Sequence, residues 1–214
     1  MTRPTARREA LERRRRRAPT AAERQRDAER SREQLLAAAL DEFAAHGYAG
    51  ARVSAIAARA GLNPQLITYY FGGKPGLFRA LTQRWLDQET AIQQPDVSLE
   101  DLAIGYFRAT IDDPRMARLL LWLGLTDAER SDDDVSGDTP QREDLSDLQR
   151  RQESGEIAAD LDVGLFQLAL MGATLAPVSM PHVVRRITGL DPGDPDFKNR
   201  YGETLRRIVR HLAR

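Results

Sequence analysis

The side chains that could carry out chemistry are few and widely spaced. The chain has no cysteine, which excludes disulfides and thiolate metal sites. Its three histidines lie at 46, 182 and 211, so none belongs to a His-x-x-x-His or HExxH pattern. The three consecutive aspartates at 132–134 lie within "SDDDVSGDTP", which is typical of a solvated loop. With no nucleophile motif and no cofactor loop, the residues predict neither an enzyme nor a bound metal or cofactor.

A second chemical possibility lies in "NPQLITYYFGGKPG", residues 63–76. Its glycines and Lys74 superficially resemble a phosphate-binding loop. The stretch lacks the G-x-x-x-x-G-K-[ST] pattern and follows a predicted helix rather than a strand, so we assign no nucleotide site. Two adjacent tyrosines, Tyr69 and Tyr70, instead lie on a helix of about two turns. A helix this short gains little by exposing an aromatic ring unless something binds there.

The elements that position these residues are all expected to be helices. Apolar side chains recur at helical spacing, and no stretch shows the alternation of a strand, so we predict an all-α fold of about nine helices. The helical pattern is expected to break at Pro177 and Pro181. The expected helices cover residues 26–46, 53–60, 64–71, 75–90, 98–112, 114–129, 141–154, 161–176 and 196–212.

The segments 53–60 and 64–71, joined by a three-residue turn with a glycine, have the proportions of a helix-turn-helix. Asn63 is a good N-cap, and Pro64 suits the first helical position. In the second helix, Ile67 and Phe71 lie four residues apart and are expected to face the core. The opposite face is then formed by Gln65, Thr68 and Tyr69, with Leu66 and Tyr70 at its flank.

The stretch "LLAAALDEFAAHGYAGARVSAIAARAGLNPQLITYYFGGKPGLFRAL", residues 35–81, resembles the DNA-binding domain of the TetR family of transcriptional regulators. The features that match are the aromatic-x-x-x-Gly-Tyr after the first helix, the Ile-Ala-x-x-Ala-Gly at 56–61, and the hydrophobic-x-Tyr-x-Phe-Gly-x-Lys block at 67–74. The resemblance implies a homodimeric, sequence-specific DNA-binding protein with an N-terminal helix-turn-helix and a C-terminal helical domain for effector binding and dimerisation. It further implies a repressor that a small, partly apolar effector releases from a palindromic operator.

The resemblance also implies roles for individual residues. Gln65 and Leu66 are expected to meet base edges, Gln65 by bonding adenine and Leu66 by touching a thymine methyl. Tyr69 and Tyr70 are expected to contact phosphates, and Lys74 to approach the DNA backbone as a point charge. Tyr70 as an aromatic at the edge of the core, and Lys74 as a solvated loop charge, remain alternatives.

At two positions the sequence departs from the family pattern. Thr68 replaces the first of two tyrosines found in many members, which leaves its DNA contact open. Arg52 replaces a helix-capping threonine or serine and is expected to pair with a phosphate instead.

The rest of the chain resembles the family in layout. We expect residues 1–22 to be a basic arm without fixed structure, 23–74 the DNA-binding domain, and 75–214 the effector-binding and dimerisation domain. The helix that leaves Lys74 is the expected lever between these two domains. The expected effector pocket is lined by Tyr106, Phe107, Trp122, Met171, Leu175 and His182. The expected dimer interface, which could instead be internal core, is formed by Leu165, Phe166, Ala169, Leu170, Phe197, Tyr201, Leu205 and Ile208.

Charge and hydropathy set the remaining expectations. The net charge is zero, yet residues 1–32 hold twelve arginines and five acidic residues. This basic arm either contacts DNA or serves only solubility. No apolar run reaches the length of a membrane span and no signal peptide is evident, so a cytoplasmic protein is expected. The family resemblance further implies a bacterial, nucleoid-associated protein. The other classes of function that remain open are an α-helical enzyme without a recognisable motif and a nonspecific DNA-compacting protein that uses the arm.

Overall fold

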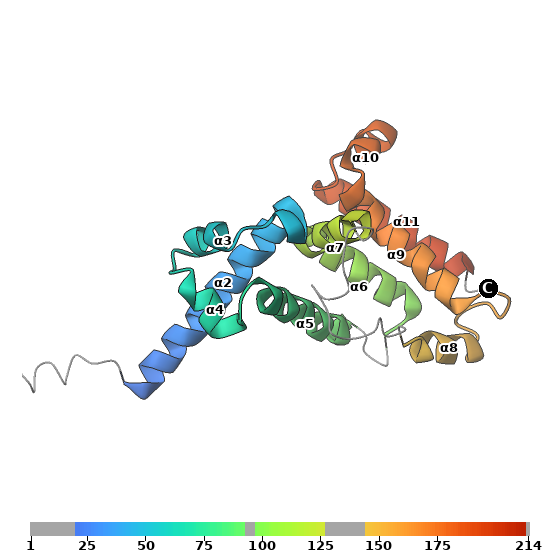
Figure 1. The fold of residues 1–214 in the computed structure, drawn as a ribbon. Helices are drawn as coiled ribbons and strands as arrows, with labels where there is room; N and C mark the ends of the chain where they lie inside the picture. The colour runs from blue at the N-terminus through green and yellow to red at the C-terminus, as the bar shows by residue number, and fades with distance from the viewer. Residues whose placement is uncertain (1–19, 93–96, 127–143, 213–214) are drawn as a thin grey trace, which may run out of the picture.

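The computed structural model describes residues 20–92, 97–126 and 144–212. The expected acidic loop at 131–140 and most of the basic arm lie outside these residues. The described part of the chain forms ten α-helices and contains no strand (Figure 1), in agreement with the predicted all-α fold. They are α2 (Ala21–Gly50), α3 (Val53–Ala60), α4 (Gln65–Phe71), α5 (Lys74–Ile92), α6 (Leu99–Asp112), α7 (Arg115–Thr126), α8 (Ser146–Glu153), α9 (Val163–Ser179), α10 (Pro181–Thr188) and α11 (Pro195–Leu212).

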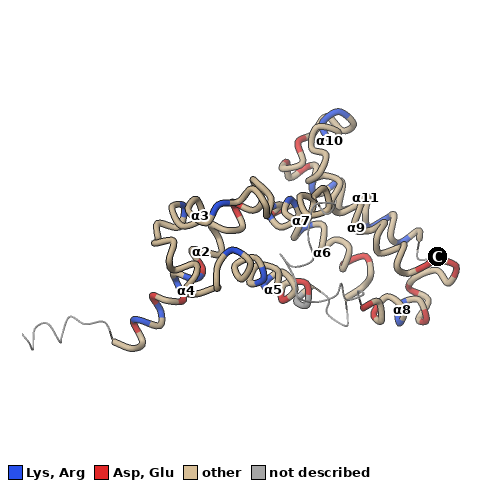
Figure 2. Tube along the Cα trace, in the orientation of Figure 1, with Lys and Arg blue, Asp and Glu red and all other residues tan. Residues whose placement is uncertain are grey.

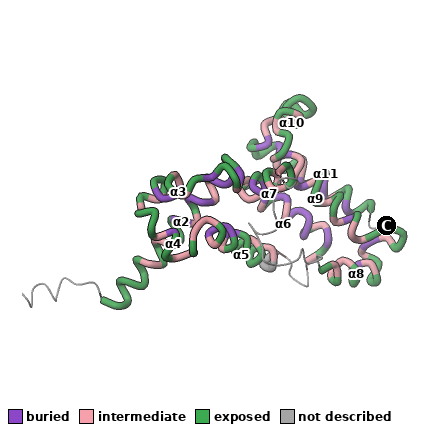
Figure 3. The backbone as a smooth tube through the Cα atoms, in the orientation of Figure 1, coloured by how far each residue is buried: buried purple, intermediate pink, exposed green. Residues whose placement is uncertain are grey.

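Helix α2 begins earlier than predicted. Thr20 and Glu23 form a capping box, in which each side chain accepts a hydrogen bond from the other residue's backbone N–H. The helix therefore starts at Ala21, inside the expected arm, rather than near residue 26. Its first turns are exposed (Figure 3) and alternate between basic and acidic residues (Figure 2). The predicted stop is confirmed, because Gly47 has φ 67° and ψ 173° and interrupts the helix.

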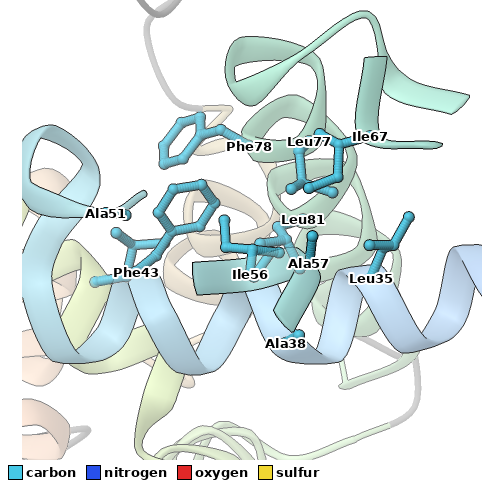
Figure 4. Close-up of a cluster of buried hydrophobic side chains, with 12 residues drawn as sticks. Leu35, Ala38, Phe43, Ala51, Ile56, Ala57, Ile67, Leu77, Phe78 and Leu81 are labelled. Atoms are coloured by element: carbon cyan, nitrogen blue, oxygen red, sulfur yellow. The ribbon is translucent and has the colours of Figure 1, made fainter. Parts of the chain in front are cut away.

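We call α2, α3 and α4 the head and α5 to α11 the body. The core of the head extends beyond the head itself, because α5 contributes Leu77, Phe78 and Leu81 (Figure 4). Helix α7 contributes Leu119 to the same core. Burial of these side chains packs the first helices of the body against the head. The buried residues of the head are Leu35, Ala38, Ala39, Phe43, Ala51, Ile56, Ala57 and Ile67.

A second core holds α6, α9 and α11 together. Its buried side chains are Leu99, Leu102, Ala103, Ile104, Phe107, Ile111, Ile157, Phe166, Leu205 and Val209. Helix α9 does not end at residue 176 as expected, and Pro177 lies inside it. A proline lacks the N–H that would bond to the carbonyl four residues earlier, here that of Ala173. The Tyr201 hydroxyl on α11 donates a hydrogen bond to the Ala173 carbonyl at 2.8 Å. This bond replaces the missing one, so α9 can continue past Pro177.

The sequence patterns did not predict helix α10. Pro181 was expected to break the helical pattern, but it stands at the first helical position, where its missing N–H costs nothing. The helix ends at Gly189, which adopts the left-handed conformation with φ 72°. Among the described helices, none is by itself both long and apolar enough to span a membrane. The pair α9 and α10 reaches that length only together, with a bend of 87°.

Candidate DNA-binding site

The turn between α3 and α4 has the geometry of a helix-turn-helix. Gly61 ends α3 in the left-handed conformation with φ 67°, which a residue with a Cβ rarely adopts. Asn63 then accepts a hydrogen bond from the Gln65 N–H through its side-chain oxygen, at 2.9 Å. Pro64 has helical backbone angles. Helix α4 therefore begins at Gln65, one residue later than predicted, with Pro64 rather than Asn63 at the N-cap position. The Asn63 contact fixes the direction in which α4 leaves the turn.

The two faces of α4 differ as predicted. Ile67 is fully buried in the core of the head. Gln65, Thr68 and Tyr69 are exposed on the other side, and 79% of the Tyr69 surface is accessible. Leu66 is half-buried between the two faces. The short helix therefore presents an amide, a hydroxyl and a phenol together to solvent, all groups that can hydrogen-bond to base edges or phosphates.

Tyr70 lies at the edge of the core. It is half-buried, and its ring meets that of Tyr69 edge to face, with the ring centroids 5.0 Å apart. The guanidinium of Arg32, on α2, lies 5.2 Å from the centroid of the Tyr70 ring. Tyr70 thus supports Tyr69 from one side and brings a cation from α2 beside α4. Neither the nearby Arg32 cation nor the edge-to-face contact of the two tyrosine rings could be deduced from the spacing of residues in α4.

Lys74 begins α5 directly after Gly72 and Gly73, both of which have positive φ. Its ammonium group donates to the Ala49 carbonyl at 3.2 Å and lies 4.6 Å from the centroid of the Tyr48 ring. Its side chain is therefore held against the end of α2 rather than standing in a solvated loop. The cation remains at the head surface, close to α4, where it could also meet a phosphate.

Arg52 does not cap α3 with its side chain, and the capping role passes to α2. The Glu42 carboxylate, which is almost fully buried, accepts a hydrogen bond from the Arg52 N–H at 3.3 Å. A negative charge at this helix N-terminus is favourable because of the helix dipole. The Arg52 side chain is exposed and, among the described residues, forms no ion pair. It is thus available to a phosphate.

Gly76 was not singled out from the sequence but determines how α5 joins α4. A Cβ built on this residue would lie 1.6 Å from the Phe71 carbonyl oxygen. Only glycine lets the first turn of α5 approach the end of α4 so closely. The sequence signal was weak, because glycine inside a helix is usually read as a local weakness rather than as a packing requirement.

The six expected pocket residues differ in their burial. Phe107 is buried in the second core, Met171 and His182 are exposed, and Tyr106 and Leu175 are half-buried. Trp122 instead lies against the backbone of α2, because a Cβ built on Gly47 would be 3.3 Å from its ring. A cavity of about 510 Å³ lies elsewhere, between α2, α5, α6 and α7, and none of the six residues lines it.

The expected interface residues divide into three groups. Leu165, Ala169 and Ile208 are exposed, and Leu170 and Tyr201 are half-buried. The prediction is wrong for the remaining three, because they are buried inside the single chain and cannot meet a partner: Phe166, Phe197 and Leu205. The predicted helical spacing of apolar residues in α9 and α11 is correct. The spacing alone did not distinguish the side chains that face the chain's own core from those that face outward. Leu168, missed from the sequence, is 64% exposed on α9 beside Leu165.

Comparison with known proteins agrees with this geometry. The family described as "Bacterial regulatory proteins, tetR family" matches residues 35–81, which cover the second half of α2, helices α3 and α4, and the first turns of α5. The HTH-type transcriptional repressor SCO4008 of Streptomyces coelicolor is 38% identical over 104 residues, which are 47% of this chain and 53% of that protein. The match thus spans about half the length of that relative. The HTH-type transcriptional regulator RutR of Escherichia coli K12 is 25% identical over 89% of this chain and 93% of its own length.

Solved structures share the overall fold. The crystal structure of SCO4942 from Streptomyces coelicolor matches 83% of this chain and 97% of its own, with a TM-score of 0.63 and 22% identity. A gamma-butyrolactone receptor, described as ArpA-like, matches 86% of this chain and 98% of its own, with a TM-score of 0.54 and 22% identity. The helix-turn-helix and the exposed face of α4 form a candidate DNA-binding surface. Residues 35–81 thus match a family model of tetR-type bacterial regulatory proteins, and most of the chain is similar to an HTH-type transcriptional regulator.

Proposed function

We propose that this protein is a homodimeric repressor that binds a palindromic operator through α4 and leaves it when a small, partly apolar molecule binds. The observation that carries the proposal is the two-faced helix α4. Its fully buried Ile67 anchors the helix, while Gln65, Thr68 and Tyr69 are exposed together on the opposite face. A surface of this size and polarity suits the major groove, which admits one α-helix.

In the proposed complex the contacts divide into two kinds. Gln65 and Leu66, at the start of α4, read base edges, the glutamine by hydrogen bonds to adenine and the leucine by apolar contact. Tyr69, Lys74 and Arg52 contact phosphates and set the position of the helix along the groove. Thr68 lies on the same exposed face and supplies a further hydroxyl. Tyr70 acts mainly through Tyr69 and Arg32, because its ring is half-buried between them.

Dimerisation is supported by the apolar surface of α9 and α11. Leu165, Leu168 and Ile208 are 68%, 64% and 49% exposed, and on a single chain this surface faces water. Two copies that pack these helices together form a four-helix bundle with twofold symmetry. A dimer of this kind places two copies of α4 on successive turns of one DNA face, which matches a palindromic site.

Two other functions have less support. An α-helical enzyme would need a cluster of reactive groups, and among the described residues no three potential metal ligands come together. A nonspecific DNA-compacting protein would depend on the basic arm rather than on α4. Deletion of residues 1–19, which keeps the Thr20 cap of α2, separates these cases. A specific regulator keeps its sequence preference after this deletion, whereas a compacting protein loses most of its binding.

The direct test begins with selection of genomic fragments by the purified protein, followed by titration of the selected site. Tyr69→Phe removes one hydroxyl and is expected to weaken operator binding without lowering the melting temperature. Lys74→Ala is expected to reduce the slope of log K against log salt by about one unit per half-site. Unchanged affinity in both variants, with intact helical content by circular dichroism, would refute these assignments.

A further inference from the structure

The cavity of about 510 Å³ lies at the junction of head and body rather than inside the body. Its wall from the head is α2, through Leu36 and Leu40, and its walls from the body include Leu81 and Trp85 on α5 and Met116 on α7. The volume falls within the range of roughly 300–1,000 Å³ that holds small organic ligands. A molecule bound here would touch the DNA-binding head and the body at the same time.

The charged groups around this cavity are already paired. Glu33 accepts a hydrogen bond from Arg84 at 2.6 Å. Asp112 forms an ion pair with Lys198 at 2.6 Å. Asp113 accepts hydrogen bonds from Arg115, which hold the pKa of its carboxyl below the usual value and keep it ionised. A charged ligand would find no unpaired counter-ion among these groups and would lose its hydration on entry, so a neutral molecule is favoured.

Hydrogen-bonding capacity remains on two lining residues. In the described part of the chain, neither the Trp85 indole N–H nor the Gln88 amide takes part in a hydrogen bond. The indole can only donate, whereas the amide can donate and accept. An oxygen acceptor on the ligand, such as a carbonyl, matches both side chains. The lining therefore favours a mostly apolar ligand that carries one or two neutral oxygen atoms.

Two ion pairs beside the cavity connect the head to the body. Glu33 on α2 bonds to Arg84 on α5, and Asp41 on α2 bonds to Arg115 on α7 at 2.9 Å. Asp41 also lies 3.8 Å from Arg59 on α3, within the helix-turn-helix. A change in the spacing of α2 from α5 and α7 must therefore alter these pairs and move α3 with α2. This arrangement gives a bound molecule a direct route to the orientation of α4.

We propose that this cavity between the head and the body is the effector site, and that it takes a neutral, mostly apolar molecule with a carbonyl or similar oxygen acceptor. The proposal rests on the regulatory function proposed above. Binding wedges α2 away from α5 and α7, so that the two copies of α4 in a dimer no longer fit successive major grooves. The six residues expected from the sequence to line an effector pocket play no part in this site.

The test uses the full chain and Nile red, a neutral apolar dye with a carbonyl oxygen. The chain has two tryptophans, so a Trp122→Phe background leaves Trp85 as its only tryptophan reporter. Saturable dye binding, one molecule per chain, should change the emission of Trp85. Ala37→Phe, at an exposed lining position on α2, should weaken dye binding by roughly tenfold or more, while Ala45→Phe, exposed on α2 outside the lining, should not. Gln88→Phe provides a second filling variant on α5.

The outcomes separate the site from the regulatory function. Dye affinity that is unchanged in both filling variants, or Trp85 emission that is unchanged at saturation, overturns the site. If that happens while the protein still prefers its selected DNA, only the site fails. If dye binding follows the predicted pattern but the protein has no DNA sequence preference, the regulatory function fails and the cavity stands as a ligand site. The effector site and the regulatory function are both supported only if Nile red weakens operator binding of the parent chain and does not weaken that of Ala37→Phe.

Discussion

Replacement of Leu165 by alanine provides a quantitative test of the proposed dimer. Leucine to alanine removes three carbon groups, worth about 2.4 kcal/mol when fully transferred from water at about 0.8 kcal/mol each. In the single chain 68% of Leu165 is exposed, so about two thirds of this value, roughly 1.6 kcal/mol, is available to a partner. Twofold symmetry doubles the effect to about 3 kcal/mol per dimer, which weakens dimerisation on the order of 100-fold.

Sedimentation equilibrium over a wide range of concentrations measures this change directly. Leu125→Ala is the matched control, because Leu125 is 82% exposed on α7 and is not part of the proposed α9 and α11 surface. It should leave the dimer constant unchanged. The thermal midpoint of the Leu165→Ala chain, measured where both proteins are monomeric, should stay within a few degrees of the parent. A dimer constant within about twofold of the parent, or a parent chain that stays monomeric throughout, would refute the assigned interface.

Three further changes test the fold that supports the site. Glu42→Gln should lower the free energy of unfolding, measured in urea, by about 1 kcal/mol, because the charged acceptor of the Arg52 N–H is lost. An unchanged urea midpoint would contradict the role of Glu42 as the cap of α3. Gly76→Ala should lower the free energy of unfolding by more than about 2 kcal/mol, because the added Cβ overlaps a main-chain oxygen of α4. Gly124→Ala is the control and should not destabilise the protein, because nothing lies near a Cβ at that position. Burial raises the pKa of Tyr201, so the contribution of this group to stability is complete below the ordinary tyrosine pKa of about 10 and is lost as the pH rises through the higher folded value. Tyr201→Phe should remove from the absorbance titration at 295 nm a phenol that ionises above that ordinary value.

The helix-turn-helix within the head could be predicted from the sequence because its signals are local. Gly61 and Gly72 mark helix ends by a backbone conformation that other residues avoid, and both have positive φ in the structure. The spacing of Ile67 from its neighbours determines which face of α4 is buried. The exposed positions of Gln65 and Tyr69 then follow from helix geometry alone.

The body was harder to predict because its deciding contacts join residues far apart in the sequence. Pro177 looked like a helix end, and the hydroxyl that permits it inside α9 comes from Tyr201 on another helix. An apolar stripe on α9 does not by itself say which side faces the chain's own core, so Phe166 and Leu165 were placed on one interface. The cavity combines α2 with α5, α6 and α7, a grouping that no local pattern indicates.

The central claim is that α4 reads sequence, and the ratio of two dissociation constants tests it most directly. The purified chain is titrated against its selected palindrome and against a scrambled duplex of the same length and composition, both at 0.15 M salt, on the order of physiological ionic strength. The palindrome is expected to bind at least about 1,000-fold more tightly than the scrambled duplex. The Gln65→Ala variant should reduce that ratio by roughly 10-fold while leaving the scrambled affinity unchanged. Equal affinities of the parent chain for the two duplexes would contradict the claim.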